Sequence, residues 1–170
     1  MTEIVTERLV LRPFVEADRQ AMLEIQTDPE TNRFNPRPPD IAGTQLTFDS
    51  WLAHWAELGY GYLAVRERDR PEAADGSDVI GMTGVRNRDF RGEQVLNLAY
   101  RFRPSAWGKG YAVEAARAAL EWAERDMPEI PVLISVTVTN EPSLRVVEKL
   151  GFTKYEEEVY DGGLSRHFRR

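Results

Sequence analysis

The chain of 170 residues contains no cysteine and only two histidines, His54 and His167. Without cysteine it can form no disulfide, no thiolate metal site and no cysteine acyl-enzyme. Two histidines are also too few for a histidine-rich metal site, so we expect no bound metal. Any catalysis must therefore depend on oxygen groups, backbone dipoles or a single histidine.

Long apolar runs and an excess of positive charge are missing as well. No apolar run approaches the roughly 20 residues that a membrane span requires. The N-terminal MTEIVTERLV lacks the plan of a signal peptide, so we expect a cytoplasmic protein with no membrane partner. The formal net charge of −6 argues against general nucleic-acid binding, which needs a basic face. The length predicts one domain over residues 1–170.

Helices and strands are predicted to alternate along the chain. Alternating and β-branched apolar residues favour strands at residues 8–12, 61–66, 79–85, 94–103 and 132–138, and a closing hairpin at 152–159 and 164–168. Helical periodicity favours helices at residues 15–26, 45–58, 108–125 and 142–150. Four prolines interrupt residues 27–40. This order predicts an α/β or α+β fold built around a mixed sheet.

The segment PSAWGKGYAVEAA, residues 104–116, joins a predicted strand to the longest predicted helix. Gly108 and Gly110 permit close approach of the backbone, and the first amides of a helix have no partner inside the helix. These N–H groups and the helix dipole suit a pyrophosphate, to which Lys109 would add a positive charge. The alternative is an ordinary glycine turn that opens a helix. Two other nucleotide motifs do not fit, since GxxxxGK[ST] is absent and Val113 stands where GxGxxG needs its third glycine.

A second informative segment is TNEPSLRVVEKLGF, residues 139–152. Asn140 stands where a predicted strand gives way to a helix, so its side chain either caps the helix or reaches into a cleft. Ser143 begins the same helix and either faces that cleft or makes a local turn hydrogen bond.

The two segments together resemble the GNAT superfamily of N-acetyltransferases, in particular its RimJ/RimL-like branch of ribosomal-protein alanine N-acetyltransferases. WGKGYAVEA resembles the acyl-CoA pyrophosphate loop of that family, and the opening TERLVLRPF resembles the first strand of the branch. The similarity spans essentially the whole chain. Two positions depart from the family pattern: Ser105 replaces a Gln or Arg, and Val147 replaces a tyrosine that protonates the departing thiolate.

The resemblance implies a mixed, mostly antiparallel sheet of about seven strands flanked by about four helices. It also implies acetyl-CoA as co-substrate, with the backbone of residues 100–102 polarising the thioester carbonyl. The residues that it assigns to acetyl-CoA binding are Tyr100, Arg101, Phe102, Trp107, Gly108, Lys109, Gly110, Tyr111, Ala112, Asn140 and Ser143.

Acetyl transfer to an amine requires removal of a proton, since most amines are protonated near neutral pH. The absence of cysteine favours direct attack in a ternary complex. The resemblance implies Ser143 or water as the acid and places Asn140 near the thioester. Relatives carry Glu near Asn97, so the base lies elsewhere; Glu93 is our candidate, with Asp89, His54 and water alone as alternatives.

We therefore expect an acetyl-CoA-dependent N-acetyltransferase that acts on a primary amine, either a protein N-terminus or a small molecule, as a monomer or homodimer. The alternative is a non-catalytic acyl-CoA-binding module. For Glu114 we favour a structural role near a helix start. Core packing is the preferred role of most aromatic residues in the region that forms the acceptor wall in relatives, which are Phe34, Trp51, Trp55 and Tyr60.

Overall fold

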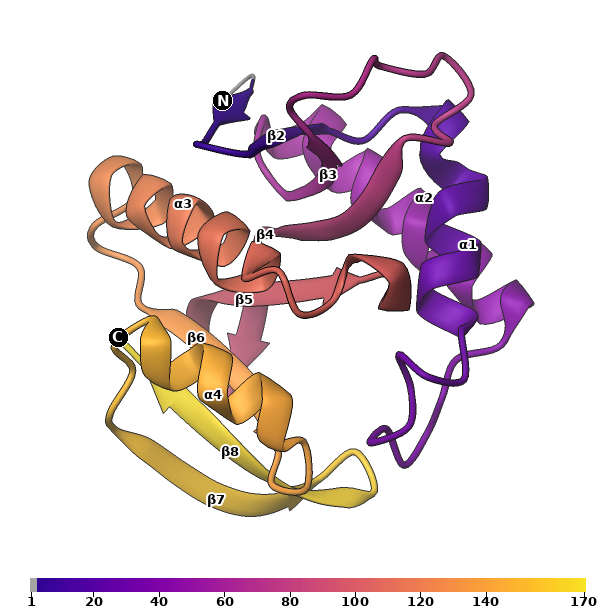
Figure 1. The fold of residues 1–170 in the computed structure, drawn as a ribbon. Helices are drawn as coiled ribbons and strands as arrows, with labels where there is room; N and C mark the ends of the chain where they lie inside the picture. The colour runs from indigo at the N-terminus through magenta and orange to yellow at the C-terminus, as the bar shows by residue number, and fades with distance from the viewer. Residues whose placement is uncertain (1–2) are drawn as a thin grey trace.

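The computed structural model describes residues 3–170, which form an eight-stranded sheet in the order β1-β2-β3-β4-β5-β6-β8-β7 (Figure 1). The strands are β1 (Ile4–Val5), β2 (Leu9–Pro13), β3 (Tyr62–Glu67), β4 (Val79–Phe90), β5 (Glu93–Phe102), β6 (Val132–Thr137), β7 (Tyr155–Tyr160) and β8 (Gly163–Arg169). The helices are α1 (Arg19–Thr27), α2 (Ile41–Leu58), α3 (Tyr111–Asp126) and α4 (Glu141–Lys149), with short 3-10 helices at Glu16–Asp18 and Pro104–Ala106. All neighbouring strands are antiparallel except β5 and β6, so the predicted mixed, mostly antiparallel sheet is confirmed.

Three elements have bounds that the sequence patterns did not predict. Strand β4 runs to Phe90 instead of Val85, because Arg91 and Gly92, with φ of 56° and 81°, form a tight left-handed turn that joins it to β5. Helix α2 begins four residues early, where the Asp40 carboxylate accepts a hydrogen bond of 2.6 Å from the Gly43 amide. Helix α3 begins at Tyr111, because Gly108 and Gly110 have φ of 76° and 77° and lie outside the helical region.

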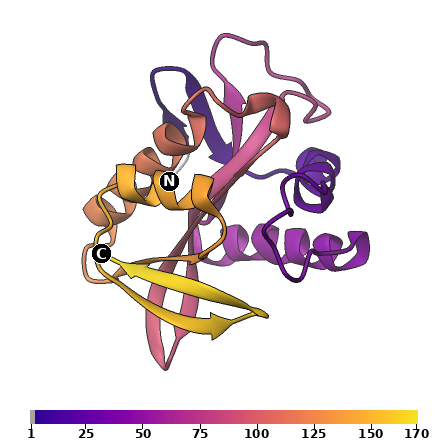
Figure 2. The ribbon, with the colours of Figure 1, turned by 60° about the horizontal axis from the view of Figure 1, so that its bottom comes forward.

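The sheet opens between β5 and β6. Strands β4 and β5 pair from Gly81↔Phe102 to Phe90↔Glu93, whereas β5 and β6 pair only at Leu96↔Val132 and Asn97↔Leu133. Beyond Asn97 the two strands diverge. In Figure 2 the β7–β8 hairpin (yellow), which continues the sheet from β6, is turned away from β4 and β5.

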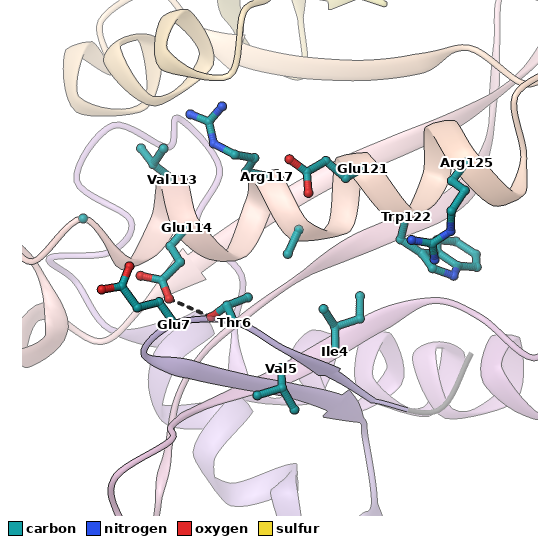
Figure 3. A pocket seen from close by; sticks show the side chains of 12 residues that line it. Ile4, Val5, Thr6, Glu7, Val113, Glu114, Arg117, Glu121, Trp122 and Arg125 are labelled. Atoms are coloured by element: carbon teal, nitrogen blue, oxygen red, sulfur yellow. Dashed lines mark hydrogen bonds between the residues drawn. The ribbon is translucent and has the colours of Figure 1, made fainter.

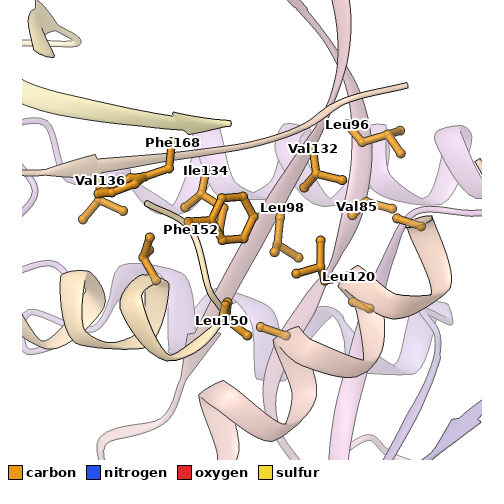
Figure 4. Close-up of a cluster of buried hydrophobic side chains, with 14 residues drawn as sticks. Val85, Leu96, Leu98, Leu120, Val132, Ile134, Val136, Leu150, Phe152 and Phe168 are labelled. Atoms are coloured by element: carbon orange, nitrogen blue, oxygen red, sulfur yellow. The ribbon is translucent and has the colours of Figure 1, made fainter. Parts of the chain in front are cut away.

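Helices cover both faces of the sheet. Helices α3 and α4 pack against one face through a cluster of buried side chains from β4, β5, β6 and β8 (Figure 4). Three fully buried alanines of α3, Ala116, Ala119 and Ala123, allow that helix to lie close to the strands. Helices α1 and α2 cover the opposite face, α1 with Met22 and Ile25 and α2 with Phe48 and Trp51. Among residues 3–170 no helix has both the length and the apolar character that crossing a membrane requires.

Candidate functional site

A cleft of about 410 Å³ lies at the opening between β5 and β6, and we call it the β5–β6 cleft. Its walls come from the end of β5, the turn before α3, the first turns of α4 and the loop between α1 and α2. The structure brings ten of the eleven residues predicted to bind the co-substrate into its lining: Tyr100, Arg101, Phe102, Trp107, Gly108, Gly110, Tyr111, Ala112, Asn140 and Ser143.

The turn that leads into α3 presents free backbone donors to this cleft. Gly110 is the N-cap of α3 and has no side chain to satisfy the first amides of the helix. Among residues 3–170 no acceptor is found for the amides of residues 110–113, and the first bond of the helix runs from the Glu114 amide to the Gly110 carbonyl at 3.1 Å. Unpaired amides at the positive end of a helix dipole form an anion site.

The Lys109 side chain lies outside the lining of the cleft. Its ammonium lies 3.8 Å from the Glu67 carboxylate and 5.7 Å from the centroid of the Tyr111 ring. Its carbonyl accepts a hydrogen bond of 2.7 Å from Arg8, and the residue does not line the cleft. The structure therefore places the Lys109 ammonium beside a carboxylate and a ring face, which both attract it.

Glu114 braces the start of α3 against the N-terminal strands. Its carboxylate accepts hydrogen bonds from the Thr6 hydroxyl at 2.6 Å, the Arg8 amide at 2.8 Å and the Arg8 guanidinium at 2.7 Å. Figure 3 shows this carboxylate beside Thr6 in a separate groove between β1 and α3. Burial raises the pKa of Glu114, but the hydrogen bonds from Thr6 and Arg8 outweigh it, and the pKa lies below its usual value. These contacts agree with a structural role for this glutamate.

Two hydroxyl groups meet inside the cleft. The Tyr100 phenol oxygen lies 2.7 Å from the Ser143 hydroxyl oxygen, and the phenol also donates to the Ser143 carbonyl at 3.1 Å. Burial raises the pKa of Tyr100 to about 12, so the phenol keeps its proton at any physiological pH. The Asn140 side chain accepts a hydrogen bond of 3.1 Å from the Ser143 amide and therefore caps α4. The partner of Tyr100 is 43 residues away along the chain, so no local sequence signal could have predicted this pair.

Val147 stands at the position where the family pattern has the tyrosine that protonates the departing thiolate. It lies one helical turn after Ser143 on α4, but its side chain is 0% exposed and packs in the core between α4 and the sheet. A side chain at this position points into the core and not toward the hydroxyl pair.

Glu93 lies at the wrong end of its strand to act as the base. It begins β5, seven residues before Tyr100 and on the order of 23 Å away along an extended chain. Both carboxylate oxygens bind the Arg169 guanidinium, at 2.6 and 2.5 Å, and this pairing lowers the pKa of Glu93. The structure therefore does not support Glu93 as the base. Asp89 is no better placed, since its carboxylate accepts the Gly92 amide at 3.1 Å in the hairpin turn.

The loop between α1 and α2 forms one wall of the cleft, whereas the sequence predicted only an irregular segment here. Glu30, Thr31, Arg33 and Phe34 line the cleft, whereas Trp51 is buried in the core as expected. Arg101 holds the loop in place, because its guanidinium donates a hydrogen bond of 2.8 Å to the buried Asn32 side chain. Burial lowers the pKa of Arg101. The prolines predicted an irregular segment here, but they contain no information about which strand it would contact.

Comparison with known proteins places these features in a family. Residues 8–153 match the family described as "Acetyltransferase (GNAT) domain". The Bacillus subtilis (strain 168) protein YkkB is 30% identical over 157 residues, which cover 88% of this chain and 84% of that protein. An acetyltransferase from Agrobacterium tumefaciens str. C58 superposes with a TM-score of 0.82 at 26% identity, over 100% of this chain and 94% of that one. RimL, a ribosomal α-N-protein acetyltransferase in complex with coenzyme A, superposes with a TM-score of 0.74 at 15% identity, over 98% and 96% of the two chains.

Proposed function

Since the chain belongs to the GNAT family of acetyl-CoA-dependent N-acetyltransferases, we propose that it transfers the acetyl group to a primary amine by direct attack within a ternary complex. The observation that carries this proposal is the β5–β6 cleft, where free amides at the start of α3 and the Tyr100–Ser143 hydroxyl pair face one space. Bound acetyl-CoA supplies the acetyl thioester and a pyrophosphate. The cleft fits such a molecule, because it offers an anion site at one wall and neutral donors at another.

The backbone of β5 supports the proposed polarisation of the thioester carbonyl. The Leu96 amide donates toward β6, with a bond of 2.9 Å to the Pro131 carbonyl. Amides two residues apart point to the same edge of a strand, so the Tyr100 amide also points to the β6 side. It lies beyond Asn97, the last residue that pairs with β6, and therefore faces the opening. A backbone N–H in this position stabilises negative charge on a carbonyl oxygen.

The hydroxyl pair supports Ser143 as the group that meets the departing thiolate. A thiol has an ordinary pKa of about 8.5, so a thiolate leaves readily if a donor stabilises it. The Tyr100 phenol keeps its proton, and when it donates that proton to the Ser143 hydroxyl oxygen, the serine hydrogen is free to point into the cleft. Asn140 acts indirectly in this arrangement, because it fixes the first turn of α4 and with it the position of Ser143.

The acceptor is a primary amine that enters from the side of the α1–α2 loop. RimL, by its title, acts on a protein N-terminus, which supports a protein or peptide α-amine as the first class to examine. Small-molecule amines are the second class. Release of free thiol from acetyl-CoA with a panel of N-terminal peptides and small amines distinguishes the two. It also separates an enzyme from a protein that only binds acyl-CoA, since a pure binder releases no thiol with any amine.

Substitutions in the glycine turn test the proposal most directly. Gly108→Glu and Gly110→Glu place a carboxylate beside the free amides, and we expect acetyl-CoA binding to fall by at least about 100-fold in calorimetry. Space is available for either side chain, since a Cβ on Gly108 has no neighbour within 4 Å and one on Gly110 has only the end of Arg8, at 3.4 Å. Circular dichroism should therefore report a retained fold.

Gly92→Glu is the matched control. Gly92 also has a positive φ, of 81°, and an open Cβ position, but it lies in the β4–β5 turn at the far end of the sheet. It carries the same added charge and backbone strain without touching the cleft, so acetyl-CoA should bind to it as to the wild type. Wild-type affinity in both cleft variants would refute the proposed phosphate site.

A further inference from the structure

Three polar side chains form a continuous chain on the sheet face opposite α3 and α4. They come from neighbouring strands: Ser135 from β6, His167 from β8 and Glu158 from β7. The Ser135 hydroxyl oxygen lies 2.7 Å from Nδ1 of His167. Oε1 of Glu158 lies 2.9 Å from Nε2 of the same ring, although not in line with the N–H bond. No role in the proposed reaction has yet been given to any of the three.

The neighbouring groups determine where the hydrogens of this chain lie. Arg88 donates to the Ser135 oxygen at 2.9 Å, and a guanidinium has no acceptor, so the serine hydrogen must point elsewhere. Nδ1 of His167 is the acceptor in reach. A carboxylate facing Nε2 favours a hydrogen on that nitrogen, which leaves the Nδ1 lone pair free to accept from Ser135. His167 is therefore aligned to receive a proton through Ser135.

Ser135 lies where the sheet opens. It is two residues beyond Leu133, the last residue of β6 that pairs with β5. Ile134 and Val136 of β6 pack against α3 and α4, so Ser135 points to the opposite face, together with Asn97. One nitrogen of Arg88 binds both, at 3.0 Å from the Asn97 amide oxygen and 2.9 Å from Ser135. Ser135 is half-buried while His167 is only 3% exposed, so the serine is the more accessible of the two.

We propose that Ser135 and His167 form the proton relay that deprotonates the acceptor amine, with Glu158 as the residue that positions the imidazole. The inference rests on the proposed function and fills the position of the base that Glu93 does not supply. An ammonium N–H donates to the free lone pair of Ser135. Before the nitrogen attacks, one of its protons moves to the serine oxygen while the serine hydrogen moves to Nδ1 of His167. The amine regains its electron pair, serine is unchanged, and the positive charge ends on an imidazolium beside Glu158.

The surroundings of His167 suit a base that is neutral before the reaction. Burial lowers the pKa of His167, Glu158 raises it, and Arg88 and Arg91 lower it again, with a net decrease. The other neighbours are Phe90 and Tyr160, whose rings lie 4.8 and 5.1 Å from the imidazole, while Glu156 is paired with Arg91. The ring is therefore uncharged at neutral pH, and the Glu158 carboxylate is available to stabilise it once it gains a proton.

Kinetics of two variants and a matched control test the relay. We expect Ser135→Ala and His167→Gln to lower kcat by about 10- to 100-fold with the KM for acetyl-CoA unchanged. In His167→Gln the acidic limb of the kcat–pH profile should move up toward the pKa of the acceptor amine. His54→Gln is the matched control, because it removes the other histidine, whose ring contacts the Tyr60 carbonyl at 2.8 Å and the Asn87 amide at 3.3 Å. In this variant kcat and the pH of the acidic limb should both remain at their wild-type values. A kcat and an acidic limb in folded His167→Gln that match those of His54→Gln would overturn the proposal.

A nitrogen NMR measurement tests the alignment without any turnover. With only two histidines, His54→Gln identifies the His167 signals. We expect a neutral ring at pH 7 with hydrogen on Nε2, and a shift of the Nδ1 signal in Ser135→Ala. Hydrogen on Nδ1, or an imidazolium at pH 7, contradicts the relay. Failure of the wild type to bind acetyl-CoA or to acetylate any amine would instead contradict the proposed function, so the two failures are distinguishable.

Discussion

At the scale of single residues, the chemistry of the cleft depends on which polar atoms are still free once the fold has formed. Asn140 is occupied, since its side-chain oxygen caps α4. Ser143 has only its amide occupied by that cap, and its hydroxyl remains in the cleft beside the Tyr100 phenol. Two polar residues of the same segment therefore differ, since the side chain of Asn140 caps the helix and that of Ser143 has the chemical role in the proposed reaction.

Removal of either hydroxyl should slow acetyl transfer without weakening acetyl-CoA binding. We expect Ser143→Ala to lower kcat by about 10-fold and Tyr100→Phe to lower it less, since a hydrogen bond to a charged group is worth about 1.5–3 kcal/mol and Tyr100 acts through Ser143. Steady-state kinetics and calorimetry with acetyl-CoA measure the two effects separately. Ser50→Ala, on α2 with its hydroxyl bonded to the Thr47 carbonyl, is the control. An unchanged kcat in Ser143→Ala would remove the serine as the acid.

Restoring the family tyrosine at Val147 should fail. The side chain is fully buried in the α4 core, so a phenol there overpacks the cluster and is expected to cost about 1–3 kcal/mol of stability. Urea denaturation measures this loss, and the kcat of the remaining folded protein should not rise. A stable Val147→Tyr variant with a higher kcat would show that this position does face the thioester.

At the scale of elements, the anion site depends on how the start of α3 is held. Its amides are free because two glycines with positive φ delay the helix, and the turn is fixed from outside by Arg8, which binds both Glu114 and the Lys109 carbonyl. The turn between β1 and β2 therefore supports the glycine turn before α3.

Neutralising Glu114 should loosen this support. We expect Glu114→Gln to cost about 1 kcal/mol of stability, because it weakens three hydrogen bonds to a carboxylate that is mostly buried, and to weaken acetyl-CoA binding severalfold. Thermal unfolding and calorimetry measure the two effects. Glu121→Gln is the matched control on the exposed side of the same helix and the same groove, and it should change neither quantity. Equal behaviour of the two variants would argue against the brace.

At the scale of the whole molecule, carboxylates connect the elements around the cleft. Glu24 binds Arg103 at 2.7 Å and connects α1 to the end of β5, while Glu67 accepts from Tyr111 at 3.0 Å and connects β3 to α3. The pKa of Glu24 is lowered, mainly by the hydrogen bond from Arg103. Burial raises the pKa of Glu67, but bonds from Tyr111 and Arg70 outweigh it, and the net shift is downward, as for Glu114.

These shifts predict that the protein loses stability in acid. A carboxylate whose pKa is lower in the folded state stabilises the fold above its unfolded value, here 4.5, and this contribution disappears as the pH falls through the folded pKa. Urea denaturation from pH 7 to pH 3 should show a first decline in the free energy of unfolding below about pH 6.5, where the two histidines with lowered pKa take up protons more readily in the unfolded chain, and a further decline below pH 4.5 from the carboxylates. The triple variant with Gln at positions 24, 67 and 114 should be less stable at pH 7 and decline less steeply. Parallel curves for the two proteins would contradict this assignment.

Local patterns in the sequence predicted the element types and order and the glycine turn, because periodicity, proline and glycine act over a few residues, whereas the family resemblance supplied half of the residues that line the cleft. The local patterns failed at the β4–β5 turn, where Arg91 adopts a positive φ, a conformation that its residue type does not predict. They also did not predict the partners of Lys109 and Glu93, whose charges are bound by Glu67 and Arg169, distant in sequence.

Only the tertiary structure decided how far β6 follows β5, and so where the cleft opens. It also brought Tyr100 to Ser143 and Ser135 to His167, pairs that are 43 and 32 residues apart. Contacts of this kind depend on strand order and register, which follow from the packing of the whole sheet between two pairs of helices. The sequence by itself determined which atoms can hold an anion or carry a proton, and the fold determined which of them meet.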